Sequence, residues 1–526
     1  MSHVSSEETQ DQNNIRDTKY VGGFYLTSEA HHAVSNFVPL HLRNGWTFWH
    51  SSRGLLQTTN DDGNQELVLF GTFFHLNEQN NKIAAERLLR AYISGEEEFE
   101  CEFDYFVGRF VLLINSPTEC CVFNDALGTR SIYYAVDQQA VSSHYNLLAT
   151  KLGEAPVRTW QESRMAMDLT KSSQINQLLP NFKLDCLKSE SSRFFPVQAN
   201  EFSTWSHNDK QTEITRLWNA SLDRLLNGTN QVVFSISGGL DSRLSVAMAH
   251  EYWENLNLYT YGTKVPKDTK YSQVMNRDYV IAHELIEIIR PKNYKFIHLA
   301  ENRKLQPALA TLLKTNSLTQ HGPSLVQRYR EEFPGDDWIH VRSNGIEVAR
   351  GYFGFKDSVE SIIKTCQNDG AIDFHSRLEI LGYGSPQHGY NRRDLFYWEI
   401  RMGKWHSEVL NETDAAFETI LPHNSRRIIK LLLSYSPEQR KSSFAIKELI
   451  NRNAPILNFF GINDERNLYE IVRDERPRNT NASNIHRPLT SAALIKQTTK
   501  ILISRGLKKV KNLIRRNYTR NSKYAK

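Results

Sequence analysis

Residues 232–245, VVFSISGGLDSRLS, decide the fold that we expect for this chain. A β-rich run ends at a pair of glycines, and a helical pattern of apolar residues begins directly after them. A strand joined by a tight turn to a helix is typical of a parallel, doubly wound sheet. Ligands bind such sheets beyond the carboxyl ends of the strands. The turn at Gly238 and Gly239 is therefore the first place to look for a site.

The composition of this turn favours a phosphate ligand. Two glycines let backbone N–H groups approach an anion, and the following helix directs its positive end to the same point. Serine hydroxyls add donors, and Asp241 is placed to hold Mg²⁺ against the phosphates. A plain turn with a capping Asp, the alternative, needs only one glycine. No Gly-Lys-Ser/Thr follows, which excludes a Walker-type loop. We expect a phosphate-bearing ligand at Ser235, Ser237, Gly238, Gly239, Asp241 and Ser242.

The segments beyond the turn continue the alternation of strands and helices. We expect helices at 213–226, 241–253 and 276–289, and strands at 231–237, 256–263 and 295–300. Residues 300–475 have a mostly helical pattern. The pattern predicts an α/β domain with a parallel sheet and a helical C-terminal part over residues 209–480.

The first part of the chain has a different pattern. We expect strands at 65–76, 106–115, 120–125, 131–136 and 141–150, with one helix at 81–95. Strands joined by hairpin-like connections around one helix predict an α+β layer structure for residues 20–208. Residues 1–19 are polar and indicate a solvated arm.

Composition places the protein among ordinary soluble proteins. Hydrophobic residues make up 40% and charged residues 23%, and no apolar run is long enough to cross a bilayer. The five cysteines form no CxxC pair, which favours free thiols in a reducing cytoplasm over disulfides or zinc. Residues 491–526 hold eleven Lys and Arg and no acid, and without them the net charge of +5 becomes −6. The 481–526 segment predicts a basic amphipathic tail that either packs on its own domain or contacts an anionic surface, RNA or an acidic partner.

The SGGLDS turn resembles the loop of the ATP pyrophosphatase group, and three other stretches narrow the resemblance. Residues 106–136 are similar to a glutaminase-domain segment, with matches at Asp125, Gly128, Arg130 and Tyr134. Residues 342–352, RSNGIEVARGY, resemble an acidic loop, and residues 417–428 resemble a Glu-Xaa-Arg-Xaa-Pro segment. In this order the stretches resemble the asparagine-synthetase-like family, which includes class-B asparagine synthetases, β-lactam synthetases and lasso-peptide cyclases.

The resemblance implies further site residues. It matches Glu347 to an acid of the second loop, Glu418 to the acid of the third segment and Lys447 to a helical lysine, while Arg466 is the nearest candidate for a basic residue that stabilises adenylation. It also places Tyr261 and Gly262 beside the nucleotide. The family's metal-binding Asp is replaced by Ile346, and the Cys that follows Met1 in class-B enzymes is replaced by Ser2. We therefore expect an Ntn-hydrolase-like glutaminase domain that has lost its activity.

The resemblance implies an ATP-dependent, amide-forming ligase. A carboxylate would be adenylated with release of pyrophosphate, and ammonia or an amine would then displace AMP, with Asp241 as the metal ligand and Glu418 as a candidate base. The partners would be ATP, a small-molecule or peptide carboxylate, and the amine. Two alternatives stay open: a tRNA-modifying ATP pyrophosphatase that uses the basic tail, and a non-catalytic paralogue.

Overall fold

The computed structural model describes residues 15–29, 33–61, 63–299, 304–366 and 372–475. The predicted arm at 1–14 and the basic tail from residue 476 lie outside the described residues. The described residues through Glu470 belong to one compact unit, and those at 471–475 belong to another. The predicted domain boundary between residues 208 and 209 stays a prediction.

The first part of the chain builds two antiparallel sheets. Sheet A has the strand order β10-β8-β9-β1-β3-β2, and sheet B the order β12-β11-β7-β6-β5-β4. The bounds in sheet A are β1 Phe24–Thr27, β2 Phe37–His41, β3 Thr47–Ser51, β8 Tyr133–Ala135, β9 Ala140–Ser142 and β10 Ile175–Gln177. Those in sheet B are β4 Leu55–Asn60, β5 Glu66–His75, β6 Phe106–Ser116, β7 Glu119–Asn124, β11 Phe182–Asp185 and β12 Glu190–Arg193.

The two sheets pack face to face between helical layers. Phe48 of sheet A meets Phe70 of sheet B with ring centroids 5.8 Å apart, inside one shared core. The outer face of sheet B is covered by α1 (Asn81–Ser94) and α2 (Glu96–Phe103), and that of sheet A by α3 (Tyr145–Leu152). The short α4 (Trp160–Ser163) follows. Successive side chains of a strand point to opposite faces, and nearly all of those on β1, β5 and β6 are buried, so these strands are covered on both sides. The result is a four-layer arrangement, which confirms the predicted α+β class.

One predicted strand was wrong. Residues 141–150 contain the short strand β9, after which the chain turns into helix α3. Tyr145, Leu147 and Leu148 pack on the outer face of sheet A, so tertiary packing and the left-handed Gly153 at the helix end override the β-rich composition.

The second part of the chain carries a parallel sheet of five strands, in the order β15-β14-β13-β16-β17. Their bounds are β13 Gln231–Ser235, β14 Asn257–Gly262, β15 Asn293–His298, β16 Trp338–Val341 and β17 Glu418–Ile420. The first three confirm the predicted strands, whereas β16 and β17 fall in the stretch predicted as mostly helical. Both are short and lack period-two alternation, so no local pattern marks them.

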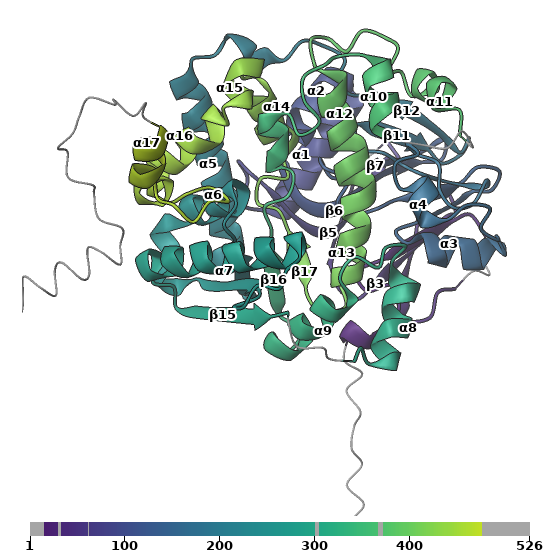
Figure 1. Cartoon of the computed structure of the whole chain (residues 1–526). Coiled ribbons are helices and arrows are strands. Elements are labelled where there is room, and N and C mark those ends of the chain that lie inside the picture. The colour runs from purple at the N-terminus through teal and green to yellow at the C-terminus, as the bar shows by residue number, and fades with distance from the viewer. Residues whose placement is uncertain (1–14, 30–32, 62, 300–303, 367–371, 476–526) are drawn as a thin grey trace, which may run out of the picture. The chain divides into compact units, whose positions relative to one another are not determined.

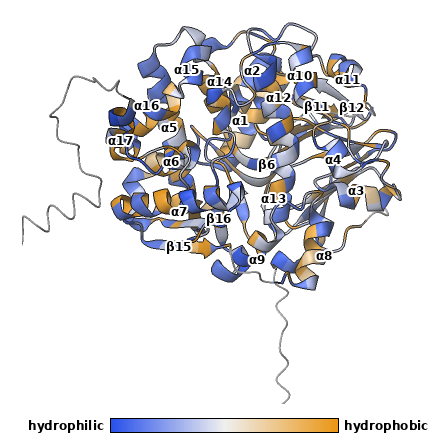
Figure 2. Ribbon diagram, in the orientation of Figure 1, coloured by the Kyte–Doolittle hydropathy of each residue, from blue (hydrophilic) through white to orange (hydrophobic). Residues whose placement is uncertain are grey.

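Helices cover both faces of the parallel sheet, as the doubly wound prediction requires (Figure 1). One face packs on α5 (His207–Leu226), α6 (Leu240–Met248) and α7 (Lys270–Ile289), and α16 (Phe444–Asn453) packs on α6. The other packs on α8 (Pro307–Asn316) and α9 (Pro323–Glu332). Figure 2 shows hydrophilic and hydrophobic residues side by side on α7, which buries Ile281, Ala282, Leu285 and Ile289. This amphipathic pattern is what a helix needs to lie on a sheet.

The remaining regular elements of the described residues are helical. The α-helices are α10 Val359–Cys366, α11 Phe374–Ile380, α12 Arg392–Phe396, α13 Ser407–Thr413, α14 Arg426–Leu433, α15 Pro437–Lys441 and α17 Leu468–Glu475. A π-helical segment, η5, spans Tyr397–His406. The 3₁₀ segments are η1 Ile15–Asp17, η2 Glu201–Thr204, η3 His250–Asn255, η4 Ile346–Arg350 and η6 Pro455–Phe459. All five cysteines are free thiols; four are buried, and Cys101 is exposed. Within the described ranges no helix is long and apolar enough to cross a membrane.

Candidate functional site

The glycine turn lies at the carboxyl end of the central strand of the parallel sheet. β13 pairs with β14 on one side and β16 on the other, and α6 begins at Leu240 directly after the turn. Gly239 is the N-cap residue, and no side chain caps this helix end. The helix therefore presents uncapped N–H groups and its positive end to the space above the sheet.

Most of the turn's own donors already have partners. The N–H of Ser237 donates to Oγ of Ser242 at 3.1 Å, and the N–H of Gly239 donates to Oγ of Ser237 at 3.2 Å. The N–H of Gly238 donates to a carboxylate oxygen of Asp278, from α7, at 2.9 Å. An acidic side chain thus accepts a hydrogen bond that a phosphate oxygen would accept in a phosphate-binding loop. Asp278 was not predicted as a site residue, because it lies 40 residues after Gly238 in the sequence and belongs to none of the motifs.

A cavity of about 220 Å³ opens beside the turn. Its lining comes from the carboxyl ends of the strands and the segments that follow them: Ser235, Ile236, Ser237, Asp241, Ser242, Tyr259, Tyr261, Asp278, Tyr329, His340, Arg342, Ser343, Asn344 and Glu347. Six of the predicted site residues are therefore brought together here: Ser235, Ser237, Asp241, Ser242, Tyr261 and Glu347. Gly238 and Gly239 form the turn itself. Gly262 ends β14 close to Met275, where a Cβ would meet the Met275 carbonyl at 2.5 Å, so it serves close packing.

Asp241 is the most perturbed acid of the cavity. One carboxylate oxygen accepts Nη2 of Arg350 at 2.5 Å, and the other, Oδ1, is buried without a hydrogen-bond partner among the described residues. Burial raises the pKa of Asp241 to about 7, with a further contribution from the charge of Glu347, and Arg350 opposes both. Two acids and one arginine therefore share this corner of the cavity.

Glu347 is held by the start of segment η4. Its carboxylate accepts the N–H of Gly345 and the hydroxyl of Tyr397, each at 2.7 Å. Gly345 has φ 99°, and a Cβ there would lie 2.8 Å from Leu127, so only glycine fits this turn. Tyr397 comes from the π-helical segment, and nothing in the sequence marks it as a neighbour of Glu347.

Asp241 and Glu347 are the carboxylates that could hold a magnesium ion in this cavity. Across the described ranges no group of three or more His, Cys, Asp or Glu side chains is arranged to hold a metal. Mg²⁺ needs fewer protein ligands, because it is commonly bound by one or two carboxylates together with substrate phosphates. The partnerless Oδ1 of Asp241, next to Glu347, is an oxygen of the kind that such an ion takes.

Arg243 fastens the C-terminal part of the unit to the back of the turn. The side chain is fully buried and donates to the carbonyls of Gly238, Leu457, Phe460 and Gly461 at 2.7–3.3 Å. Burial lowers its pKa to about 10. The turn is thus stabilised from behind by a side chain of its own helix.

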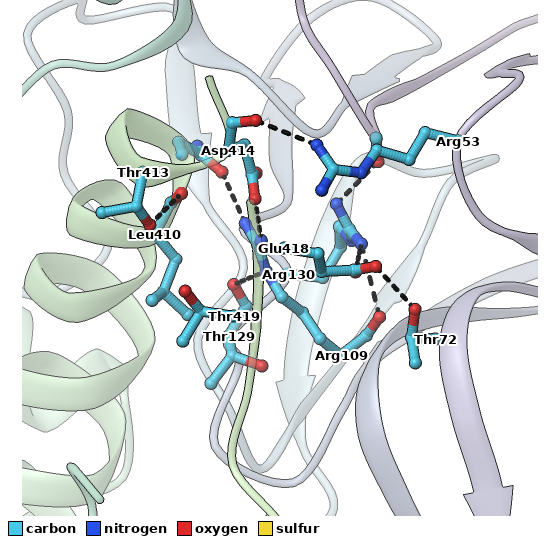
Figure 3. A network of polar contacts seen from close by, with 12 residues as sticks. Arg53, Thr72, Arg109, Thr129, Arg130, Leu410, Thr413, Asp414, Glu418 and Thr419 are labelled. Atoms are coloured by element: carbon cyan, nitrogen blue, oxygen red, sulfur yellow. Dashed lines mark hydrogen bonds and ion pairs between the residues drawn. The ribbon is translucent and has the colours of Figure 1, made fainter. Parts of the chain in front are cut away.

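The predicted residue Glu418 lies elsewhere. In the register of the parallel sheet it stands opposite Ile339, at the amino end of the strands, while the turn lies at the carboxyl end. Its carboxylate accepts Oγ1 of Thr72 at 2.7 Å and Nη2 of Arg130 at 3.0 Å (Figure 3). It lines a separate cavity of about 380 Å³. This geometry gives no support to Glu418 as a base acting in the cavity beside the turn.

Two more predicted residues lie outside the cavity lining. Lys447 is exposed on α16, and its carbonyl accepts the side chain of Asn458 at 2.9 Å. Arg466 is half exposed and pairs with Asp464 at 2.5 Å, which lowers the pKa of Asp464 to about 2. A lysine on a solvated helix face and a locally paired arginine are ordinary surface arrangements.

The glutaminase-like segment forms a buried polar turn. The carboxylate of Asp125 accepts the N–H groups of Thr129 and Arg130, each at 2.8 Å. Nη1 of Arg130 donates to the carbonyl of Gly22 at 2.6 Å, just before β1. The described residues begin at Ile15, before β1, so β1 does not start at a free amino group of the kind that an N-terminal nucleophile would provide. Ser2 lies outside the described residues.

Comparisons with known proteins give no family. No family model matches the chain, and no curated protein matches it. Among solved structures, the allosteric regulatory enzyme of purine biosynthesis matches at 11% identity, 68% of this chain, 88% of that chain and a TM-score of 0.23. The B. subtilis glutamine phosphoribosylpyrophosphate amidotransferase is 12% identical, with 58% of this chain and 88% of that chain covered and a TM-score of 0.22. The Francisella tularensis NMN synthetase is 15% identical, with 40% of this chain and 96% of that chain covered and a TM-score of 0.19. Similarity at these TM-scores carries no argument about function.

Proposed function

We propose that this protein is an ATP-dependent ligase of the asparagine-synthetase-like type, which adenylates a carboxylate and transfers the acyl group to ammonia or an amine. One observation carries the proposal. Asp241 presents a buried, partnerless carboxylate oxygen beside Glu347, in one cavity with the serines of the glycine turn at the end of the central parallel strand. Such a combination suits a phosphate group with its counter-cation.

The residues of the turn would bind and orient the nucleotide. The uncapped start of α6 and the hydroxyls of Ser237 and Ser242, which line the cavity, would bind the phosphates, and Asp241 with Glu347 would hold Mg²⁺. The ion would supply positive charge that stabilises the phosphate oxygens. Because Gly238 and Asp241 are engaged by Asp278 and Arg350, nucleotide binding requires these two contacts to open.

The chemistry would consist of two displacements. An oxygen of the substrate carboxylate attacks the α-phosphorus of ATP, and the bond from this phosphorus to the bridging oxygen breaks, so pyrophosphate leaves. The amine nitrogen then attacks the acyl carbon, the acyl–oxygen bond breaks and AMP leaves. The amine loses a proton to water or to a cavity carboxylate that does not hold Mg²⁺. Positioning and charge supply the rate enhancement.

The products of ATP test this proposal. With Mg²⁺, an amine donor and a panel of carboxylic acids, the full-length protein should form AMP and pyrophosphate in equal amounts, only when the acid is present. Formation of ADP and phosphate instead would contradict α-phosphorus attack. Asp137→Asn, on the exposed surface, serves as the control for Asp241→Asn.

A non-catalytic paralogue is the second candidate, and one observation favours it. The Asp278 carboxylate accepts the Gly238 N–H that a phosphate oxygen would accept, and the Arg350 guanidinium binds the Asp241 carboxylate that a cation would bind. The chain's own side chains therefore fill both binding positions. A protein that retains only a structural role would keep these contacts closed. Failure of ATP to bind at all, in the presence of Mg²⁺, would support this candidate over the ligase.

A further inference from the structure

A second cavity, of about 760 Å³, lies where helices α1 and α2 meet strands β7, β11 and β12 (Figure 1). It is larger than the cavity beside the glycine turn and shares no lining residue with it. Its volume falls within the range of roughly 300–1,000 Å³ that is usual for small-molecule sites. The proposed ligase makes no use of this cavity, so its lining has to be explained separately.

Four aromatic rings line the cavity in a continuous row. Tyr92 comes from α1, Phe99 from α2 and Phe123 from β7, while Phe194 directly follows β12. The ring centroids lie 5.2 Å apart for the pair Tyr92 and Phe99 and 5.1 Å apart for the pair Phe99 and Phe123. They lie 5.4 Å apart for the pair Phe123 and Phe194. Such a wall offers apolar surface to a ligand, and the faces of aromatic rings also attract cations.

The charged side chains of the lining are mostly acidic: Glu96, Glu97, Glu100 and Glu119, against Lys183 and Arg193. Both cations already have anionic partners. Nζ of Lys183 lies 3.4 Å from the carboxylate of Glu96. Arg193 donates to the two carboxylate oxygens of Glu399 at 2.6 Å and 2.9 Å, and its remaining donors are taken by the carbonyls of Leu381 and Phe195. Neither cation is therefore left to neutralise the other acids.

Two of these acids have no cationic partner. Glu97 makes no side-chain hydrogen bond or ion pair with the described residues. Glu119 accepts the hydroxyl of Tyr92 and, at 3.5 Å, the thiol of Cys121. Within the described part of the chain, no ion pair neutralises Glu119. Both carboxylates can accept a charged hydrogen bond from a ligand.

Glu100 places a third carboxylate in the cavity, and this one is buried. Its exposed fraction is 6%, and the nearest cation, Nζ of Lys430, lies 3.6 Å away, which is longer than a hydrogen bond. Lys430 donates instead to Asp104 at 2.9 Å. Burial, and after it the charge of Asp104, raise the pKa of Glu100. A positive charge added to the cavity would stabilise this carboxylate.

We propose that this cavity binds a small organic amine in its protonated form, with the ammonium group among the three carboxylates and an apolar body against the aromatic rings. The charge of the lining excludes an anion and gives a neutral ligand no advantage. An ammonium gains hydrogen bonds to carboxylates together with attraction to the ring faces. The inference is independent of the proposed ligase, because the two cavities share no residue.

Titration calorimetry with four probes tests the inference on the full-length protein near neutral pH, where an alkylamine is protonated. Phenethylamine carries both the charge and the ring. Phenethyl alcohol keeps the ring without the charge, 3-phenylpropionate reverses the charge, and ethylamine keeps the charge without the ring. Phenethylamine should bind at least about tenfold more tightly than each of the other three. No binding of phenethylamine up to about 10 mM, or equal binding of phenethyl alcohol, would overturn the inference.

Three variants locate the binding. Glu119→Gln should weaken phenethylamine binding by about tenfold, and Glu97→Gln, at a more exposed position, by about threefold. Glu98→Gln is the matched control, because Glu98 is an exposed neighbour on the same helix that does not line the cavity. It removes the same charge and should change the affinity by less than about twofold. An equal loss in Glu98→Gln would show that only the general surface charge acts, which contradicts a site in this cavity.

The other cavity provides the last comparison, since the proposed ligase also takes an amine. Asp241→Asn should leave the affinity for phenethylamine unchanged, because Asp241 belongs to the cavity beside the glycine turn. If Asp241→Asn weakens binding while Glu119→Gln and Glu97→Gln do not, the amine binds beside the turn and the inference is overturned. Thermal unfolding of each variant, which should match the parent protein, shows that the affinities compare folded proteins.

Discussion

The backbone N–H of Asn463 donates to the carbonyl of Gly238 at 2.9 Å, which ties a segment near the end of the compact unit to the glycine turn. Arg243 reinforces the connection through the carbonyls on either side of it. The turn is therefore shaped by residues more than 200 positions away as well as by its own glycines.

Arg243→Gln should destabilise the protein. The change leaves four buried carbonyl groups with fewer donors, and a cost of about 3 kcal/mol is expected. Urea denaturation measures it, with exposed Arg90→Gln as the control, which should stay within about 0.5 kcal/mol of the parent. An unchanged midpoint for Arg243→Gln would mean that the segment from Leu457 to Gly461 contributes nothing to stability.

Asp241→Asn should remove Mg²⁺-dependent activity with little change of fold. The amide keeps the shape of the side chain but loses the charge that a cation requires, and about a hundredfold loss of pyrophosphate release is expected. Rates are compared at matched thermal stability with Asp137→Asn. Full turnover in Asp241→Asn would remove Asp241 from the mechanism.

The raised pKa of Asp241 predicts a pH dependence of metal affinity. Because burial and Glu347 move this pKa to about 7, the proton must leave before the carboxylate can hold Mg²⁺. Affinity should therefore rise between pH 6 and pH 8. The same shift makes the folded state the stronger proton binder, so this group's contribution to the free energy of unfolding falls as pH rises from about 4 to about 7.

Mg²⁺-dependent binding of ATP at several pH values checks the prediction. ATP itself titrates in this range, so the profile of Asp241→Asn provides the reference. A pH profile shared by both proteins would assign the whole effect to the nucleotide.

Asp278→Asn should strengthen binding of free pyrophosphate. The amide oxygen can still accept the N–H of Gly238, but the negative charge that repels the phosphate is gone. A gain of about fivefold in affinity corresponds to about 1 kcal/mol, a typical value for one such charge near a surface. Burial already raises the pKa of Asp278, so the gain should be smaller at low pH. Weaker binding would show that the carboxylate assists the ligand.

Glutamine should not be hydrolysed. An N-terminal nucleophile would have to start β1, but β1 follows the described residues from Ile15 onward. In addition, the carbonyl of Gly22 accepts a hydrogen bond from Arg130. Incubation with glutamine should release no more glutamate than buffer does. Release that disappears in Ser2→Ala would restore a catalytic role to that serine.

Local patterns predicted the fold well where periodicity and glycine pairs were strong. The central strand, the turn and the helices beside them follow directly from residues 232–245. β16 and β17 were missed, since strands of three or four residues carry no period. Motif residues such as Asp241 and Glu347 line the same cavity, because a fixed spacing places them near the strand ends, and their roles stay predictions.

The remaining site residues depend on tertiary contacts. Arg350 and Tyr397 approach the two acids only because η4 and the π-helical segment are packed together by the fold. Glu418 shows the converse. It lies in a motif-like segment, yet the short strand β17 carries it to the other end of the sheet. A motif match fixes position along the chain, whereas the direction of a strand decides which end a residue occupies.

The buried ion pairs of Figure 3 also bear on how this protein can be divided. Arg109 pairs with Asp414 at 2.5 Å, and Arg130 pairs with Glu418, so each partner depends on a segment about 300 residues away. Expressing either part alone would leave these charges in an apolar surface without counterions, at a cost of several kcal/mol each. The first part of the chain thus supplies counterions that the second part needs in order to fold. A protein expressed without the first part of the chain should therefore be insoluble, so that its turnover could not be measured.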